Sequence, residues 1–107
     1  MPAGVYRHRV RVEKPVYTQD AMMAPVKMWE LVDVTWASIR PLRGREYFAA
    51  KSVNSEVETT IRMRPREIEN DWRVVYQNRV FGILAVLNRH ERNIELELMC
   101  KEVEHDG

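Results

Sequence analysis

The stretch DWRVVYQNRVFGILAVL, from Asp71 to Leu87, constrains the fold most strongly, because two apolar runs flank the dipeptide Gln77-Asn78. A two-residue connection containing Asn, which tolerates a positive φ, is typical of a tight β-hairpin turn. A helix is the rival interpretation, since short apolar runs are ambiguous by period alone. Enrichment in valine and aromatic residues, the turn residues and the run lengths favour two strands.

The predicted register places apolar residues on both sides of this hairpin. The expected facing pairs are Trp72 with Ile83, Val74 with Phe81, and Val75 with Val80. Neither face can be exposed to water cheaply. The hairpin is therefore expected near the centre of a sandwich or closed barrel.

Length and composition indicate one folded domain over residues 1–107, with 45% hydrophobic and 31% charged residues. No apolar run approaches the length of a membrane span, and the Met-Pro-Ala-Gly start lacks a signal-peptide hydrophobic region. The protein is expected in the bacterial cytoplasm before any assembly, with no membrane partner. The single cysteine, Cys100, is expected to be a small apolar residue of a strand.

The first half of the chain predicts two strands joined by a long loop. Residues 5–12 alternate cleanly, with Arg7, Arg9 and Arg11 on the polar side of a half-buried strand. The pattern then dissolves, and residues 15–30 are expected to form a mobile loop. Its three methionines, Met22, Met23 and Met28, suit either a surface that docks on a partner or a connector that folds back on the body. Strand character returns over residues 31–39, and Pro41 should end this second strand.

Beyond Pro41 the sequence predicts a short helix, three more strands including the hairpin, and a closing strand. LRGREYFAAKSVN, residues 42–54, has helical spacing but is too short to be stable alone, so it needs the barrel wall or a neighbouring subunit. Residues 56–64 and 94–100 alternate as amphipathic strands, and residues 103–107 form a polar tail. The fold class is therefore mainly β: a small antiparallel barrel or sandwich of about six strands with one short helix.

Charge is unevenly distributed although the net charge is only +1. Residues 40–66 carry seven basic and three acidic residues, whereas residues 91–107 carry six acidic and two basic ones. Such opposed patches could complement each other between neighbouring copies, or could be solvated strand faces.

Residues for catalysis or metal binding are not grouped in this sequence. His8, His90 and His105 are scattered, and His8 is expected to be a core or boundary residue with a satisfied ring. Glu95 and Glu97 share one face of a strand, where solvation explains them better than acid catalysis. We therefore expect no enzyme, no cofactor and no metal. A single-stranded nucleic-acid-binding barrel remains an alternative, although the arginine faces are nearly free of aromatic residues.

Four stretches together resemble the head–tail joining proteins of tailed bacteriophages, also called head–tail adaptor or head-closure (stopper) proteins. They are YRHRVRVEKP (6–15), VTWASIRPLRGREYFAAKSV (34–53), IRMRPREIENDWRVVYQNRVFGILAV (61–86) and IELELMCKE (94–102). The likeness lies in the order of the parts, which covers almost the whole chain. Two departures affect local turns: the family's hairpin often has Asn-Gly where this chain has Gln77-Asn78, and its first loop often carries a glycine where this one has Met22-Met23-Ala24-Pro25.

The resemblance implies a structural virion protein that forms a ring, commonly of twelve copies, between the portal or adaptor and the tail or tail-terminator protein. Packaged double-stranded DNA would pass through the ring and be contacted without sequence specificity. Carried over by position, residues 40–55 would face the channel, with Arg40, Arg43, Arg45, Tyr47 and Lys51 as the candidate contacts.

The ring also requires contacts between subunits or rings. We expect these at the first strand, the methionine loop and the last strand, which are represented by Arg7, Arg9, Arg11, Met22, Met23, Met28, Glu95 and Glu97. The hypothesis is that the basic surface of one copy meets the acidic last strand of the next. A tail-tube or tail-terminator component is the other structural alternative.

Overall fold

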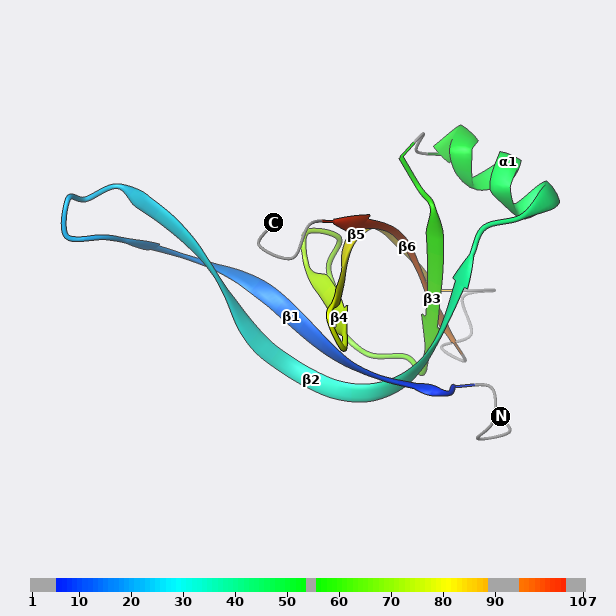
Figure 1. The fold of residues 1–107 in the computed structure, drawn as a ribbon, viewed down its shortest axis with the longest axis horizontal. Coiled ribbons are helices and arrows are strands. Elements are labelled where there is room, and N and C mark those ends of the chain that lie inside the picture. Colours follow the sequence, from blue (N-terminus) through cyan, green and yellow to red (C-terminus); the bar gives the residue numbers. More distant parts are fainter. Residues whose placement is uncertain (1–5, 54–55, 89–94, 104–107) are drawn as a thin grey trace.

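The computed structural model describes residues 6–53, 56–88 and 95–103, and in these it forms a small antiparallel barrel (Figure 1). The strands close in the order β1-β2-β3-β6-β5-β4. In chain order the elements are β1 (His8–Gln19), β2 (Pro25–Pro41), α1 (Gly44–Val53), β3 (Thr59–Met63), β4 (Arg73–Tyr76), β5 (Arg79–Asn88) and β6 (Leu96–Val103). The predicted mainly β class, the short helix and the end of the second strand at Pro41 are confirmed.

The central hairpin has the predicted register. Val74 pairs with Phe81 and Val75 with Val80, while the backbone N–H of Ile83 donates to the carbonyl of Trp72 at 3.1 Å. The turn differs in one detail. The positive φ, 53°, lies at Gln77 and not at the asparagine.

The core fills the barrel with alternate side chains from every strand. Its fully buried members include Val10, Ile61, Phe81, Leu98 and Cys100. This is the arrangement expected when inward positions alternate with outward ones around a closed sheet. Cys100 is an apolar core residue, as predicted.

A second, smaller cluster explains why the hairpin strand β5 is apolar on both faces. Leu42, Val57 and Met99 are buried together, with Leu84 and Ala85 packed against them. Met99 pairs with Ala85 and alternates with the inward-facing Leu98, so the cluster lies outside the barrel wall. Leu42 precedes α1 and Val57 follows it, so the cluster packs on the outside of the barrel where the chain enters and leaves the helix.

Residues 15–30 are not a loop, which corrects the prediction from sequence. Strands β1 and β2 stay paired beyond the barrel from Glu13–Leu31 to Gln19–Pro25, and they project from it as a long hairpin (Figure 1). We call residues 14–30 the arm. Prolines normally break a central strand, but among the described residues each strand of the arm is paired on one side only, and the missing N–H of proline is tolerated at such an edge.

The tip of the arm is a turn closed by Asp20. The Asp20 Oδ1 atom accepts the backbone N–H groups of Met22 at 2.8 Å and Ala24 at 3.0 Å. Met23 occupies the left-handed region with φ 63°. Whether the arm is mobile, as the sequence suggests, stays a prediction.

Candidate interaction surfaces

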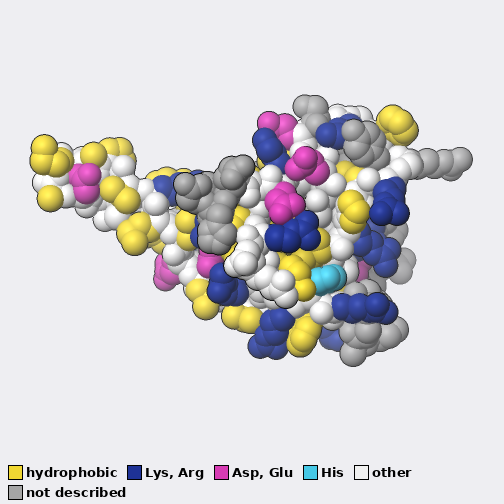
Figure 2. All heavy atoms as spheres, viewed as in Figure 1, with side chains coloured by type: hydrophobic (Ala, Val, Ile, Leu, Met, Phe, Trp, Pro, Cys, Tyr) yellow, Lys and Arg dark blue, Asp and Glu magenta, His cyan; other side chains and the backbone are white. Residues whose placement is uncertain are grey.

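Exposed hydrophobic side chains concentrate on the β1–β2 hairpin. Among the described residues, all the exposed large hydrophobic side chains except Phe48 and Leu87 belong to this hairpin. The predicted docking methionines are among them: Met22 is 86% exposed, and Met23 and Met28 are also exposed. Figure 2 shows hydrophobic side chains covering the arm toward its tip, whereas charged side chains gather over the barrel.

Cross-strand pairing on the outer face of the same hairpin joins arginines to apolar residues. Arg9 pairs with Trp36 and Arg11 with Val34, and the Arg9 guanidinium lies 5.4 Å from the centre of the Trp36 ring. We call Arg9, Arg11, Leu31, Val34 and Trp36 the outer strip. The expectation that the arginine faces are nearly free of aromatic residues is therefore wrong, because the aromatic residues come from the neighbouring strand.

A stacked tryptophan holds the root of the arm. The Trp29 ring lies between two cations, with Arg73 at 4.3 Å and Lys27 at 4.6 Å from the ring centre. Arg73 also donates through Nε to Glu13 at 2.7 Å. These contacts connect the arm to β4 and fix the direction in which it leaves the barrel.

The predicted channel-facing residues lie together at the barrel end where α1 projects (Figure 1). The side chains of Arg40 and Arg43 are exposed, and Lys51 is half-buried. The backbone of Arg45 and Tyr47 belongs to α1, but their side chains lie outside the described parts of the structure.

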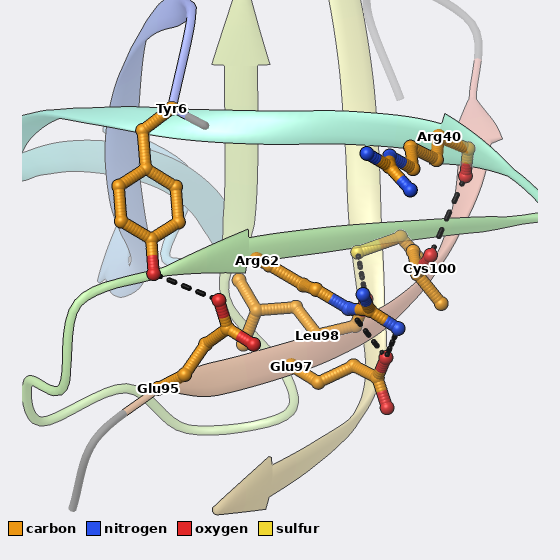
Figure 3. A network of polar contacts seen from close by, with 8 residues as sticks. Tyr6, Arg40, Arg62, Glu95, Glu97, Leu98 and Cys100 are labelled. Carbon is orange, nitrogen blue, oxygen red and sulfur yellow. Dashed lines mark hydrogen bonds and ion pairs between the residues drawn. The ribbon is translucent and has the colours of Figure 1, made fainter. Parts of the chain in front are cut away.

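The two predicted interface carboxylates of the last strand have partners in their own chain (Figure 3). The Tyr6 hydroxyl donates to Glu95 at 2.8 Å, and Arg62 donates through Nε to Glu97 at 2.8 Å, with its Nη2 atom 2.7 Å away. Glu97 points outward as predicted, yet it is only 8% exposed. Burial and the hydrogen bond to Glu95 raise the pKa of Tyr6 to about 12. The contact of these acids with a neighbouring copy stays a prediction.

Other acidic residues are exposed on the connection between β3 and β4. We call Glu67, Glu69 and Asp71 the acidic loop. All three are exposed, while Ile68 between them is buried in the barrel core. Within residues 6–53, 56–88 and 95–103 these carboxylates form no ion pair. The sequence does not distinguish these three acids from Glu95 and Glu97. Only the folded structure shows that they are exposed and, within its described residues, form no ion pair.

The described parts of the chain contain no group of three or more side chains that could hold a metal ion. No described helix is long and apolar enough to cross a membrane. Cys100 is buried, and burial raises the pKa of its thiol. His8 is half-buried, as predicted, with its ring 4.9 Å from that of Tyr76. Its buried Nδ1 has no hydrogen-bond partner among the described residues, so the prediction of a satisfied ring is wrong. His90 and His105 lie outside the described residues.

The structure is a closed β-barrel from which the arm and α1 project. The comparison of sequences gives the family: residues 1–103 match the phage head completion proteins, and the chain belongs to that family. The protein is thus a structural protein of the phage head–tail region, as the resemblance from sequence predicted. No curated protein matches the chain.

Two solved structures share the fold. The solution structure of protein SF1141 from Shigella flexneri 2a is 22% identical, with a TM-score of 0.72 and coverage of 95% of this chain and 96% of that one. A chain in the virion of a native gene transfer agent particle is 19% identical, with a TM-score of 0.63 and coverage of 92% and 96%.

Proposed function

We propose that this protein forms a homo-oligomeric ring at the head–tail connector, joins the portal or adaptor proteins to the tail or tail-terminator protein, and helps to retain packaged DNA. The observation that carries the proposal is the contrast between a sealed barrel and two projecting segments, the arm and α1. Membership of the head completion family and the likeness to a virion chain support it. Synthesis in the bacterial cytoplasm, a purely structural role without enzymatic activity and a copy number near twelve belong to the same proposal.

The arm is the proposed contact between subunits or between rings. Its exposed methionines are flexible and polarizable, which suits adaptable apolar contacts. Its two strands also have outer edges that pair with no other strand of the barrel, since β1 pairs with β4 only as far as Glu13 and β2 with β3 only from Ala37. Such edges are places where another chain can add main-chain hydrogen bonds.

The segment from Arg40 to Lys51 is the proposed DNA contact. Exposed arginines near phosphates bind without reading sequence. Their contribution weakens as the salt concentration rises, because the release of counterions from the DNA is then less favourable. α1 has ten residues, fewer than a helix needs to be stable alone in water. This shortness supports a segment that becomes fully ordered only inside an assembled ring.

Truncation of the arm tests the ring. A chain with residues 16–28 replaced by a two-residue turn should keep the barrel, because the removed residues lie outside its core. It should fail to join connector complexes, as measured by the mass of complexes purified from particles. A truncated chain that is incorporated at wild-type stoichiometry would refute the role of the arm.

Neutralisation of the basic segment tests DNA retention separately. Arg40→Gln with Arg43→Gln should leave ring assembly intact but release DNA from filled heads, which a nuclease-protection assay measures. Arg79→Gln, an exposed arginine elsewhere on the barrel, is the matched control. Full retention of DNA by the double variant would argue against a channel contact.

A single-stranded nucleic-acid-binding barrel is the second candidate, because Arg9 and Trp36 are stacked on one sheet face. Base stacking on Trp36 should quench its fluorescence on titration with oligothymidine. A titration without quenching would exclude this function.

A further inference from the structure

We propose that, in the ring, the outer strip of one copy binds the acidic loop of the next copy. This inference rests on the proposed ring and names the surfaces that close it. It replaces the last strand as the main acidic partner, for the reasons that follow.

The outer strip has the composition of a protein-binding site. Leu31, Val34 and Trp36 are 53%, 39% and 49% exposed. Across the strand pair, Arg9 faces Trp36 and Arg11 faces Val34, while Leu31 faces Glu13. An apolar patch rimmed by polar residues marks an interaction site, and tryptophan and arginine dominate binding energy at protein interfaces. The aliphatic centre of the strip favours a protein over a nucleic acid, whose phosphates gain nothing from contact with leucine or valine.

Charge selects the acidic loop as the occupant. Arg11 lies 3.9 Å from Glu13, which Arg73 also binds at 2.7 Å, whereas Arg9 forms no ion pair in the described parts of the chain. A partner for these cations in a neighbouring copy must be a carboxylate that is not already paired. Glu97 is paired with Arg62, and Glu102 is bound by Arg79 at 3.0 Å. Glu95 keeps its charge, but it is half-buried and accepts a hydrogen bond from the Tyr6 hydroxyl. The three carboxylates of the acidic loop are exposed and form no ion pair in the described parts of the chain.

A head-to-tail contact requires the two surfaces to lie on different sides of the molecule, and the contacts of β2 support this. Arg11 pairs with Val34 on the outer face, whereas Asp33 pairs with the core residue Val12 and so points to the inner face. Arg66, at the start of the connection that carries the acidic loop, forms an ion pair with Asp33. This ion pair places the start of the connection across β2 from the outer strip, and in the proposed ring each copy presents one surface to each neighbour.

Crosslinking in assembled particles tests the contact. The full chain with Val34→Cys and Glu69→Cys, treated with a short bismaleimide, should give a ladder of covalent multimers. Cys100 is buried and should not react in the folded chain. The matched control is Leu87→Cys with Glu69→Cys, because Leu87 is also 39% exposed but lies on β5. It should give no ladder.

The outcomes separate the inference from the proposed function. Particles that contain several copies of the chain but give no ladder would overturn the inference and leave the ring intact. Particles that lack the chain would overturn the proposed function itself. Oligonucleotide binding by the isolated chain that is lost in Trp36→Ser would assign the strip to nucleic acid and also overturn the inference.

Charge reversal is an independent test of the contact between the outer strip and the acidic loop. Arg9→Glu with Arg11→Glu should lower incorporation about tenfold, which corresponds to about 1.4 kcal/mol. Adding Glu67→Arg and Glu69→Arg to the same chain should restore most of it, since each contact then has its charges exchanged. An unaffected first variant, or a combined variant without recovery, would contradict the pairing.

Discussion

The barrel and the arm are built from the same two strands but depend on different interactions. In the barrel, Val10 and Val12 of β1 are fully buried, whereas Val16, four residues further along the strand, is exposed. The change coincides with Glu13, where β1 stops pairing with β4 and the β1–β2 register shifts. Pairing with one neighbouring strand is enough to form a β-strand. Its side chains are buried only where the sheet closes into the barrel.

This contrast predicts that the arm contributes little to global stability. A two-stranded hairpin is marginally stable alone in water, and at its root the arm is joined to the barrel by the contact of Trp29 with Arg73. Segments that bind partners are commonly drawn from the less stable parts of a protein. The barrel therefore carries the stability and the arm carries exposed apolar surface for assembly.

The largest expected effect compares an aromatic residue in each region. Phe81→Ala removes a fully buried ring from the barrel and should lower the free energy of unfolding by about 3–5 kcal/mol. Tyr17→Ala removes a ring that is 67% exposed on the arm and should change it by less than about 0.5 kcal/mol. Chemical denaturation measures both. A costly Tyr17→Ala would show that the arm packs against the body in solution.

The next comparison uses one ion pair from each region. Glu97→Gln leaves Arg62 in a largely buried setting without its charged partner and should cost about 2–3 kcal/mol. Glu30→Gln breaks the exposed pair with Lys14 on the arm and should cost about 0–0.5 kcal/mol. Equal costs in urea denaturation would mean that burial does not distinguish the two regions.

The pH dependence of the barrel should show the raised pKa of Tyr6. Because this pKa is about 12 in the folded chain and near 10 when unfolded, the unfolded chain loses its proton first as the pH rises. The stability from Tyr6 is therefore complete below pH 10 and is lost between pH 10 and about 12, on the order of 2 kcal/mol. Tyr6→Phe should flatten the decline over this interval in denaturation curves measured at several pH values. A decline of unchanged steepness would contradict the assignment.

The smallest effect compares the two turns with positive φ. Gln77→Gly should relieve left-handed backbone strain in the barrel hairpin and raise the free energy of unfolding by about 0.5–1 kcal/mol. Met23→Gly relieves the same strain at the arm tip but should leave global unfolding unchanged, because the arm opens separately. Equal stabilisation in thermal unfolding would show that arm and barrel unfold as one unit.

Prediction from sequence succeeded where neighbouring residues decide the structure. The register of the Val75–Val80 hairpin, the inward set of Leu98 and Cys100 and the short helix all follow from local alternation and turn chemistry. Prediction failed for residues 15–30, where the prolines indicated a loop and the structure has two paired strands. It also missed the Arg9–Trp36 stack, since these residues are far apart in the chain and meet only across β1 and β2.

By itself, the order of apolar and polar residues determined a small antiparallel β protein, its central hairpin and its likeness to phage head–tail proteins, because side-chain alternation fixes which face of each strand avoids water. Only the tertiary structure decided which charged side chains are paired within the chain and which remain exposed for contact with a partner. Glu97 and Glu69 are the same residue type in acidic stretches, yet folding places Arg62 beside Glu97 and leaves Glu69 exposed. That choice depends on pairing between distant strands, which no local pattern encodes.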